Sequence, residues 1–600
     1  MSSTTDTYML LRAFVDELTR CGMRAACTSP GSRCAPLVLS LAREERLRCF
    51  SHVDERCAGF FALGLAKTSG LPVAVACTSG TAAAELLPAA IEAREARVPL
   101  LLLTADRPAE LRDTGAGQAI DQLKLFGTAA KWFFEVGVEG AGVEDLRWMR
   151  MLACRAYWTA LEGRPGAVHL NFPLREPLVG DEELPEDPTG REGGRPHVRR
   201  VAAAVSSAAD AATLGDLLSR ARRGVVVAGR HERGTPSGQA AAAFAAAAGW
   251  PLLADPLSGA RRGEAAIAHY DALLRDGGFA GSVVPDLVLR VGDLPVSKPL
   301  RSWLAQLEGA RQVAIDPDGA WQDPASVVSD SFALDPAETL RELARERASG
   351  PLLSAEDDWL GAWRSADERA AEAILGVLGD RDLSEPAVAA ELGVLLPEEA
   401  TLFVASSMPV RDIETFWPVR SDPPRVLCNR GANGIDGTVS AAFGAAAGAS
   451  GPVVLLIGDV ALAHDIGGLL AARRLGLKLT VVLLDNGGGG IFDFLPVSAA
   501  RMARDHDRHG GGPGAPGQED LPEDIYTHHI ATPTGLDFAA AATLYGIAHE
   551  RVGDVHGFRA ALERALGEPN SSIIEVRGGR GENVALHRRV WEAVAGALNP

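Results

Sequence analysis

The chain has 600 residues, of which 47% are hydrophobic, and its formal net charge is −19. This length exceeds what one hydrophobic core can serve, so about two to four domains are expected. The acidic balance argues against nucleic acid and anionic membranes as partners and favours a soluble protein.

The eight cysteines are scattered and form no CxxC pair. This spacing predicts neither a zinc site nor a disulfide scaffold, but reduced and mostly buried thiols. Residues 1–22 lack a basic segment and a small-residue cleavage site, so they predict a first helix rather than a signal peptide. No apolar run reaches about 18 residues, the length that spans a membrane. We therefore expect a cytoplasmic protein.

The first region, residues 1–185, alternates helical patterns with short apolar runs, and polar loops follow the runs. This alternation predicts a doubly wound parallel sheet. The stretch Thr78–Thr81 is either a phosphate-binding turn or an ordinary helix cap. The runs that predict strands are 25–27, 73–77, 99–103 and 168–170, and the helical patterns are 10–21, 58–67 and 82–93.

Residues 180–200 are charged and rich in proline and glycine, which is typical of a linker. A second α/β region follows at 205–345. Its glycine turns at 229–230 and 292–293 resemble those of dinucleotide-binding folds, but no GxGxxG is present, so no dinucleotide site is expected. Its expected strands are 224–228, 252–254, 287–291 and 312–315, with a helix at 239–248.

A third α/β region occupies residues 360–600. The fold class is thus α/β, with three doubly wound parallel-sheet domains at 1–185, 205–345 and 360–600. Residues 503–520 are of low complexity and predict a mobile loop near the site. The expected strands of this region are 400–405, 426–427, 453–457, 479–484 and 572–576, and the expected helices are 465–475 and 582–598.

Two polar residues follow predicted strands of the third region, and we expect these strands to be parallel neighbours. Asp459 follows the run 453–457, and Asn486 follows the run 479–484. Adjacent strands lie about 4.8 Å apart, so a carboxylate and an amide oxygen would face one point, as Mg²⁺ requires. The glycines 487–490 can take positive φ and turn N–H groups toward a diphosphate. The alternative is an ordinary strand end with a solvated aspartate and a glycine turn.

The spacing of Asp459 and Asn486 resembles the signature of thiamine-diphosphate (ThDP) enzymes, although Val460 and Asp485 depart from it. Over essentially the whole chain, the sequence resembles the ThDP-dependent decarboxylase superfamily and, within it, a carboligase family of menaquinone biosynthesis. The stretches that carry this resemblance are TSPGSR (28–33), HVDER (52–56), TADRP (104–108), GAGQAIDQ (115–122), SKP (297–299), SMPVRD (407–412), NRGANGIDG (429–437), GGGIFDFLP (488–496), ATPTGLDF (531–538) and ENVALHRRVW (582–591).

The resemblance implies a pyrimidine-binding domain at 1–185, a central domain at 205–345 and a diphosphate- and Mg²⁺-binding domain at 360–600. Glu55 matches the glutamate that hydrogen-bonds the aminopyrimidine and enables proton removal from the thiazolium. The alternative role of Glu55 is a first-turn helix acid, with Asp54 as the capping residue. Asp459, Asn486 and the Gly488 carbonyl match ligands of Mg²⁺ or Mn²⁺, and Ile435 matches the apolar wedge under the cofactor.

The substrates of that family are the dicarboxylates 2-oxoglutarate and isochorismate, which guanidinium groups bind well. Several polar and apolar side chains match contacts to these substrates. A solvated surface charge is the alternative for any single arginine, and a plain core role for the apolar residues. The matching residues are Ser32, Arg33, Arg107, Gln118, Lys298, Arg411, Arg430, Phe492 and Leu495.

The resemblance implies a transferase. It decarboxylates 2-oxoglutarate and adds the succinyl carbanion to isochorismate, giving 2-succinyl-5-enolpyruvyl-6-hydroxy-3-cyclohexene-1-carboxylate. It also implies a homodimer or homotetramer with the cofactor at the subunit interface. Two alternatives stay open: another ThDP-dependent 2-oxoacid decarboxylase or carboligase, similar to acetohydroxyacid synthase, and a non-catalytic subunit with the same fold.

Overall fold

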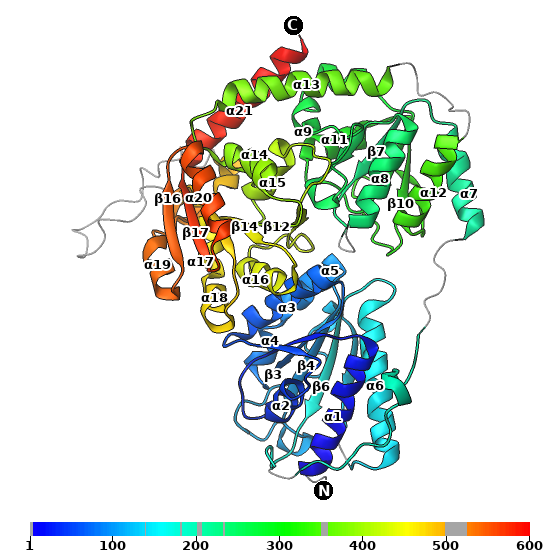
Figure 1. Ribbon diagram of the computed structural model, residues 1–600, viewed down its shortest axis with the longest axis vertical. Helices are drawn as coiled ribbons and strands as arrows, with labels where there is room; N and C mark the ends of the chain where they lie inside the picture. The colour runs from blue at the N-terminus through cyan, green and yellow to red at the C-terminus, as the bar shows by residue number, and fades with distance from the viewer. Residues whose placement is uncertain are drawn as a thin grey trace, which may run out of the picture. The chain divides into compact units, whose positions relative to one another are not determined.

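A computed structural model describes residues 4–137, 140–180, 183–200, 207–231, 235–349, 358–498 and 525–599 (Figure 1). The predicted loop at 503–520 lies outside these residues. The chain divides into two compact units, each described here by itself. Unit 1 comprises residues 1–204, 429–453 and 465–479, and unit 2 comprises residues 205–428, 454–464 and 480–600. No helix in the described ranges is long and apolar enough to cross a membrane.

The first sheet, in unit 1, has six parallel strands in the order β2-β1-β3-β4-β6-β5. Its strands are β1 (Ala25–Thr28), β2 (Arg48–Ser51), β3 (Val73–Cys77), β4 (Leu100–Asp106), β5 (Ala130–Glu135) and β6 (Ala167–Pro173). The helices of this region are α1 (Thr4–Cys21), α2 (Ala35–Ala42), α3 (Glu55–Ser69), α4 (Thr81–Ala84), α5 (Leu87–Ala96) and α6 (Val143–Leu161).

Unit 1 also contains α16 (Thr438–Gly448) and α18 (Leu470–Leu475) from later in the chain. Helix α16 packs tightly against α3 because both present small residues. A Cβ atom on Gly64 would come within 1.9 Å of the Ala441 carbonyl oxygen, and one on Gly444 within 1.9 Å of the Phe61 carbonyl oxygen. Only glycine fits at these two positions, so the close approach is built into the sequence.

The second sheet, in unit 2, has five parallel strands in the order β11-β10-β9-β7-β8. Its strands are β7 (Gly224–Ala228), β8 (Leu252–Ala254), β9 (Leu287–Val291), β10 (Arg311–Ile315) and β11 (Val328–Phe332). The helices of this region are α7 (Ala208–Ser219), α8 (Thr235–Ala248), α9 (Tyr270–Leu273), α10 (Gly277–Ser282), α11 (Lys298–Gln306) and α12 (Pro336–Ser349).

The third sheet has six strands in the order β13-β12-β14-β15-β17-β16, in which β12 pairs with β13, β14 with β15, and β17 with both β15 and β16, all in parallel. Its strands are β12 (Thr401–Val404), β13 (Arg425–Leu427), β14 (Val453–Gly458), β15 (Thr480–Asp485), β16 (Ala548–Val552) and β17 (Ser572–Arg577). The helices of this region include α13 (Trp359–Leu378), α14 (Glu385–Leu395), α15 (Met408–Phe416), α17 (Asp459–His464), α19 (Phe538–Tyr545), α20 (Val555–Gly567) and α21 (Arg580–Leu598).

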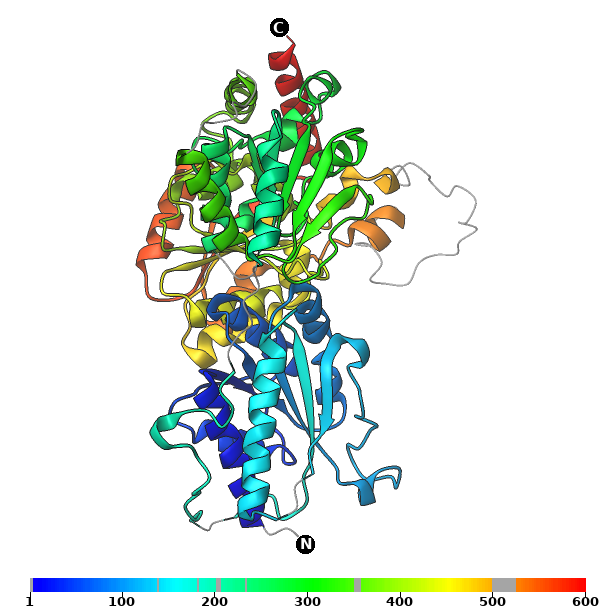
Figure 2. The ribbon, with the colours of Figure 1, turned by 90° about the vertical axis from the view of Figure 1, so that its right-hand side faces the viewer.

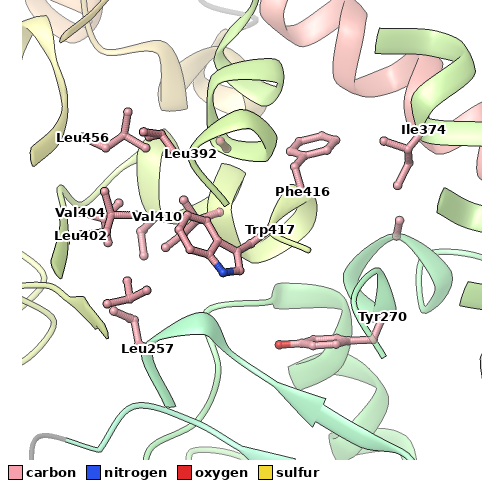
Figure 3. Packing of buried hydrophobic residues seen from close by; sticks show 14 of the residues in the cluster. Leu257, Tyr270, Ile374, Leu392, Leu402, Val404, Val410, Phe416, Trp417 and Leu456 are labelled. Atoms are coloured by element: carbon pink, nitrogen blue, oxygen red, sulfur yellow. The ribbon is translucent and has the colours of Figure 1, made fainter. Parts of the chain in front are cut away.

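A single apolar cluster connects the second and third sheets within unit 2 (Figure 3). Leu257 and Tyr270, which follow strands of the second sheet, belong to the same cluster as Leu402 and Leu456 of the third. Trp417, at the end of α15, is 1% exposed and is also part of it. Burying side chains of this size stabilises a fold by about 1.5–3 kcal/mol each relative to exposure, so this cluster is a major source of stability for unit 2.

The three-sheet α/β fold confirms the predicted class, and the ribbon shows helices flanking each sheet in both views (Figures 1 and 2). The predicted domain limits at 185, 205, 345 and 360 stay a prediction. Two helix predictions were wrong: the helical pattern at 82–93 is split between α4 and α5, and the helix expected at 465–475 is a 3-10 turn followed by α18, while α17 already begins at Asp459.

Candidate functional site

The predicted strand-end pair is present in unit 2. Strands β14 and β15 are parallel neighbours, with Gly458 opposite Leu484, so Asp459 and Asn486 follow adjacent strands directly. Asp459 is 2% exposed and begins α17. Burial raises the pKa of its carboxyl group to about 6, although backbone N–H groups of Val460 and Gly488 oppose the shift. A buried carboxylate with a raised pKa gains from a nearby cation.

The side-chain amide of Asn486 has a defined orientation. Its Nδ2 donates a hydrogen bond of 2.9 Å to Oε1 of Glu385, the first residue of α14. Its Oδ1 is buried and has no hydrogen-bond partner. Burying an amide oxygen without a partner costs free energy, so this oxygen is poised for a ligand that the protein chain itself does not supply.

The glycine loop after Asn486 is held by its own backbone. Gly487 and Gly488 have φ of 77° and 129°, and a Cβ on Gly488 would lie 2.5 Å from the Ala531 carbonyl oxygen. The Gly488 N–H donates to Oδ2 of Asp459 at 2.8 Å, and the Gly489 N–H to the Ala531 carbonyl oxygen at 2.6 Å. The Gly488 N–H thus binds the Asp459 carboxylate and the Gly489 N–H closes the loop, and the expected contact of this loop with a diphosphate stays a prediction.

These residues fit a hard divalent cation. The Asp459 carboxylate, the orphaned Oδ1 of Asn486 and the Gly488 carbonyl are oxygen acceptors, the ligand type that Mg²⁺ prefers. Because Glu385 accepts the hydrogen bond from Asn486 Nδ2, the amide is held in one orientation, and its Oδ1 is already positioned to bind a cation.

A buried acid network adjoins this strand end. Burial raises the pKa of Glu385 to about 8, and the charge of Asp412 adds to the effect. Asp412, on α15, accepts a 2.9 Å interaction from His587 Nε2 on α21. Burial alone would lower the pKa of His587, but the Asp412 carboxylate raises it. The network therefore ties α15 to α21 by a buried charge-assisted contact.

Glu55 is the first residue of α3, in unit 1. Asp54 caps that helix, with its carboxylate accepting from the N–H groups of Arg56 and Cys57, as predicted. Glu55 is half-buried, and burial raises the pKa of its carboxyl group, helped by the charges of Asp54 and Glu85. A raised pKa keeps a proton available on this group closer to neutral pH, as a general acid needs.

Two of the predicted arginines lie near each other in unit 1. Arg107 donates to Ser79 Oγ at 2.5 Å and to the Gly117 carbonyl oxygen at 2.8 Å, and burial together with the charge of Arg33 lowers its pKa. Arg33 donates to the Leu174 carbonyl oxygen at 2.8 Å. Two neighbouring guanidinium groups attract a carboxylate.

Gln118 joins the same group through Ser79. Its Nε2 donates to the Ser79 carbonyl oxygen at 3.0 Å, and Ser79 Oγ donates to the Gln118 carbonyl oxygen at 3.0 Å. Gly80, at the start of α4, has φ of 84° and donates its N–H to Gln122 Oε1 at 2.9 Å. The start of this helix is thus capped from Gln122 rather than by a side chain of its own turn.

The loop that carries Arg430 and Ile435 is anchored within unit 1 by Glu92. The N–H groups of Gly431 and Ala432 donate to the two carboxylate oxygens of Glu92, at 2.9 and 2.6 Å. Glu92 is 3% exposed. Arg430 and Ile435 are half-buried on this loop.

The remaining predicted residues divide between the units. Ser32 is exposed in unit 1, and Lys298 is exposed at the start of α11 in unit 2. Arg411, on α15, donates to the Ser407 carbonyl oxygen at 2.6 Å. Phe492 is half-buried and Leu495 is 42% exposed, both just beyond the glycine loop. The substrate-binding roles of these residues stay predictions.

Sequence reasoning missed three residues near the Asp459 and Asn486 strand ends: Glu385, Asp412 and His587. It identified Ser79 only as part of the turn Thr78–Thr81, not as a partner of Arg107. Glu385 follows Ser384 and precedes Pro386, a pattern typical of a helix start, which hides its contact with Asn486. Only the long-range contact, 101 residues apart, distinguishes it from an ordinary first-turn acid.

Three family models match the chain in the order of its sheets. Residues 10–125 match the thiamine pyrophosphate enzyme N-terminal TPP binding domain, residues 195–404 the middle domain of thiamine pyrophosphate enzymes, and residues 411–576 the C-terminal TPP binding domain. Thiamine pyrophosphate is another name for ThDP. The fold is thus that of a ThDP-binding enzyme.

Known proteins with similar sequences identify the family of ThDP-binding enzymes to which the chain belongs. Proteins named 2-succinyl-5-enolpyruvyl-6-hydroxy-3-cyclohexene-1-carboxylate synthase are 42% identical in Geobacillus thermodenitrificans, over 97% of this chain and 95% of theirs. Those of Listeria innocua and Chloroflexus aurantiacus are 39% and 40% identical, each over 98% of this chain and 97% and 96% of theirs. The chain belongs to the family of these synthases.

Proposed function

We propose that the chain catalyses the decarboxylation of 2-oxoglutarate and the transfer of the remaining succinyl unit to isochorismate, giving 2-succinyl-5-enolpyruvyl-6-hydroxy-3-cyclohexene-1-carboxylate in menaquinone biosynthesis. The main observation in favour of cofactor binding is the buried Oδ1 of Asn486, which has no hydrogen-bond partner. The buried carboxylate of Asp459 follows the neighbouring strand. Together they support a divalent cation, Mg²⁺ or Mn²⁺, and with it a diphosphate.

In this proposal Asp459, Asn486 and the Gly488 carbonyl hold the metal, and Ile435 supports the cofactor from its apolar side. The bound cofactor supplies an electron-accepting thiazolium ring, which makes loss of carbon dioxide from a 2-oxoacid possible. Glu55 holds a proton on its carboxyl group for the aminopyrimidine, a role favoured by its raised pKa.

The substrates are dicarboxylates, and the cationic residues are assigned to them. Arg33 and Arg107 are supported by their proximity in unit 1, and Gln118 by its contacts with Ser79. We assign Ser32, Lys298, Arg411 and Arg430 to polar substrate contacts, and Phe492 and Leu495 to the apolar wall. A binding site of this kind would explain cations at loop ends in a chain with a net charge of −19.

We further propose that the enzyme works as a homodimer or homotetramer, with Glu55 of one copy and Asp459 of another serving one cofactor. Sedimentation of the purified protein tests this, and a stable, fully active monomer would contradict it.

The decisive experiment for the reaction is turnover with isochorismate and 2-oxoglutarate, with and without ThDP and Mg²⁺, with pyruvate as the competing 2-oxoacid. We expect product only when both ThDP and Mg²⁺ are present. We also expect the enzyme to use 2-oxoglutarate in strong preference to pyruvate. A preference for pyruvate would indicate a different carboligase of the same fold. Cofactor binding with no turnover on any 2-oxoacid would indicate a non-catalytic subunit.

A further inference from the structure

Two thiols lie in contact in unit 1, at the junction of α1 and α6, which run side by side in both ribbon views (Figures 1 and 2). Cys21 Sγ donates a hydrogen bond of 3.6 Å to Cys154 Sγ, between residues 133 positions apart in sequence. The two side chains are 8% and 2% exposed. The mechanism proposed above uses neither of them.

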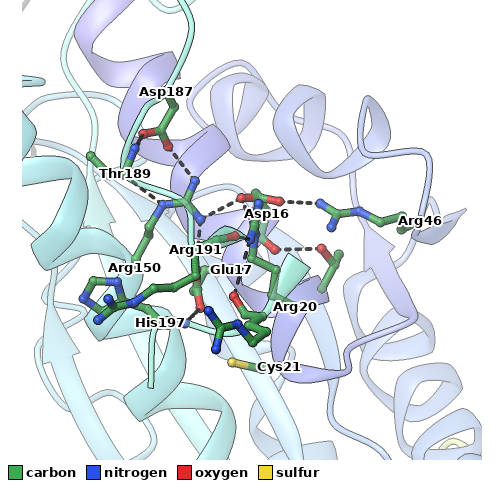
Figure 4. Close-up of polar contacts among 12 residues, drawn as sticks. Asp16, Glu17, Arg20, Cys21, Arg46, Arg150, Asp187, Thr189, Arg191 and His197 are labelled. Carbon is green, nitrogen blue, oxygen red and sulfur yellow. Dashed lines mark hydrogen bonds and ion pairs between the residues drawn. The ribbon is translucent and has the colours of Figure 1, made fainter. Parts of the chain in front are cut away.

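The helices bring these thiols together by a repeated spacing. Glu17 and Cys21 are four residues apart on α1, and Arg150 and Cys154 are four apart on α6, so each pair shares one helix face. Arg150 Nη1 donates to Glu17 Oε2 at 2.9 Å (Figure 4). This ion pair lies one helical turn away from the contact between the two sulfurs. The buried ion pair thus fixes the separation at which the two sulfurs meet.

The segment 187–198 covers this junction. Asp187 and Thr189 accept hydrogen bonds from Arg150 at 2.6 and 3.0 Å. The Val198 N–H donates to Cys154 Sγ at 3.4 Å. The His197 N–H donates to Glu17 Oε1 (Figure 4). Cys154 in turn donates its S–H to Glu17 Oε1 at 3.4 Å.

These contacts give the two sulfurs different chemistry. Cys154 Sγ receives donors from Cys21 and from Val198, which stabilise a thiolate, and the Cys21 hydrogen bond lowers the pKa of Cys154. Cys21 keeps its proton, since its contact with Cys154 and its burial raise its pKa. One sulfur is therefore prepared as the nucleophile and the other as the resolving thiol.

We propose that Cys21 and Cys154 are a modification site at which a hydroperoxide converts the two thiols into a disulfide. Cys154 Sγ attacks a peroxide oxygen, the O–O bond breaks, and the departing hydroxide takes the Cys154 proton, which is hydrogen-bonded to Glu17 Oε1, and leaves as water. Cys21 Sγ then attacks the resulting sulfenic sulfur, the S–O bond breaks, and the departing hydroxide takes the Cys21 proton and leaves as a second water. The two thiols lose two electrons and the peroxide gains them.

A disulfide suits these surroundings better than a metal ion does. Glu17, Cys21 and Cys154 have ligand atoms within 4.8 Å of one another, but among the described residues no fourth ligand joins these three, whereas a structural zinc takes four. Both Glu17 oxygens already accept hydrogen bonds, from Arg150 and from the His197 backbone. Oxidation leaves those bonds intact, because it removes only the two S–H donors.

The test uses the cofactor-loaded full chain treated with hydrogen peroxide, then alkylated and digested without reductant. We expect a peptide pair linked through Cys21 and Cys154 that separates on adding dithiothreitol, with free thiols falling from the eight of the sequence to six. The unfolding midpoint should rise on oxidation, since the cross-link restrains the unfolded chain.

Cys27 and Cys49 provide an internal control. They lie on adjacent strands β1 and β2, but Cys49 pairs with Ala26, so the side chains of Cys27 and Cys49 project from opposite faces of the sheet. Both should remain alkylated as free thiols at the peroxide concentration that links Cys21 to Cys154.

Two serine variants separate the roles of the sulfurs. In Cys21→Ser, Cys154 should accumulate as a sulfenic acid that a 1,3-dione reagent traps, whereas in Cys154→Ser, Cys21 should remain a thiol. If neither variant folds, the linked peptide of the unmodified chain decides. Oxidation of Cys27 or Cys49 at the same rate, or recovery of both Cys21 and Cys154 as free thiols, would overturn the proposal.

Discussion

The first and third sheets have the same topology but opposite chemistry at their strand ends. Counted from the first strand of each, both have the order second, first, third, fourth, sixth, fifth. Asp106 of β4 pairs with Pro173, and Asp485 of β15 pairs with Arg577, each pair closing the ladder to the sixth strand. Arg107 and Asn486, the next residues along, are therefore topologically equivalent.

The third strands extend the match. Thr104 of β4 pairs with Cys77, and Leu483, the equivalent residue of β15, pairs with Ile457. Cys77 and Ile457 are therefore equivalent, and so are the residues two positions after them, Ser79 and Asp459. The pair Ser79 and Arg107 in the first sheet thus corresponds to the pair Asp459 and Asn486 in the third.

The two pairs differ in what they leave unsatisfied. In the first sheet Arg107 donates to Ser79, so the pair is closed and carries a net positive charge. In the third sheet Asp459 bonds to Gly488 and Asn486 to Glu385, and the Asn486 Oδ1 is left as a buried acceptor. One fold therefore provides an anion-attracting edge and a cation-attracting edge, and side-chain identity alone decides which.

The largest effect is expected from the acid of the first domain. Glu55→Gln removes the proton-holding group while keeping its size, so turnover should fall by about 10²–10⁴-fold with little change in ThDP affinity. Steady-state kinetics and calorimetric titration with ThDP measure the two quantities. Near-normal turnover would show that Glu55 has no proton-holding role.

Asp54→Asn is the matched control, because it also replaces an acid by its amide, one residue earlier. Asn caps helices as well as Asp does, so stability should change little and turnover should remain close to that of the unmodified chain. A loss equal to that of Glu55→Gln would mean that the charge of this turn, and not the acid of Glu55, matters.

The cation-attracting edge is tested by Asp459→Asn. The variant keeps an oxygen but loses the charge, so the affinities for Mg²⁺ and ThDP should fall. Loss of a residue that only orients a metal ligand costs about 10–100-fold in metal affinity, and we expect a larger loss here because the ligand itself is changed. Calorimetric titration with Mg²⁺ at saturating ThDP gives the affinity. Recovery of turnover at high Mg²⁺ would confirm a binding role, and unchanged affinity would contradict the metal assignment.

The fully buried strands could be predicted from the sequence, and several edge strands could not. Runs such as Val73–Cys77 and Leu287–Val291 are buried along their whole length and were predicted at their observed bounds. The missed strands β2, β5, β11 and β16 each lie at a sheet edge and are only partly buried. An edge strand needs no continuous apolar run, so its pattern resembles a loop.

The site divides in a similar way. Asp459 and Asn486 could be predicted because each directly follows an apolar run, and parallel strands bring such ends together. Glu385 could not, because its contact with Asn486 joins residues 101 positions apart and leaves no local signal. Short-range pattern identifies what a strand end carries, whereas only the fold identifies what holds it in place.

Glu385→Met tests whether the amide orientation matters. Removing the acceptor for Asn486 Nδ2 frees the amide to rotate, so Mg²⁺ affinity should fall by about 10–100-fold. The free energy of unfolding should change little or rise, because burial already raises the pKa of this carboxyl to about 8 and a buried acid is costly. Chemical denaturation alongside the Mg²⁺ titration separates the two effects.

Glu391→Gln, on the same helix α14, is the control. Glu391 pairs with Arg559 at the surface, so its loss should leave Mg²⁺ affinity unchanged. Equal losses of affinity in both variants would point to a general disturbance of α14 rather than to the Asn486 contact.

The smallest predicted effect is a pH dependence of the unfolding free energy, which arises from a buried histidine in the first sheet that the third sheet lacks. His169 of β6 is fully buried, and burial lowers its pKa to about 3, while the equivalent residue of β17, by the same register, is Ile573. His52 is also buried in unit 1, and burial lowers its pKa to about 4.

These low pKa values make the stability of the fold depend on pH. Below the unfolded-state pKa of about 6.5, the histidines bind protons in the unfolded chain but remain neutral in the folded protein. The contribution of each histidine to the unfolding free energy should therefore fall by about 1.4 kcal/mol per pH unit between pH 6.5 and 4, and stay constant above pH 7.5. Denaturant titrations at pH 7.5 and pH 5 measure the slope, and His169→Gln, which can keep a hydrogen bond to Thr104, should reduce it by one histidine's share. An unchanged slope in that variant would show that other groups cause the acid sensitivity.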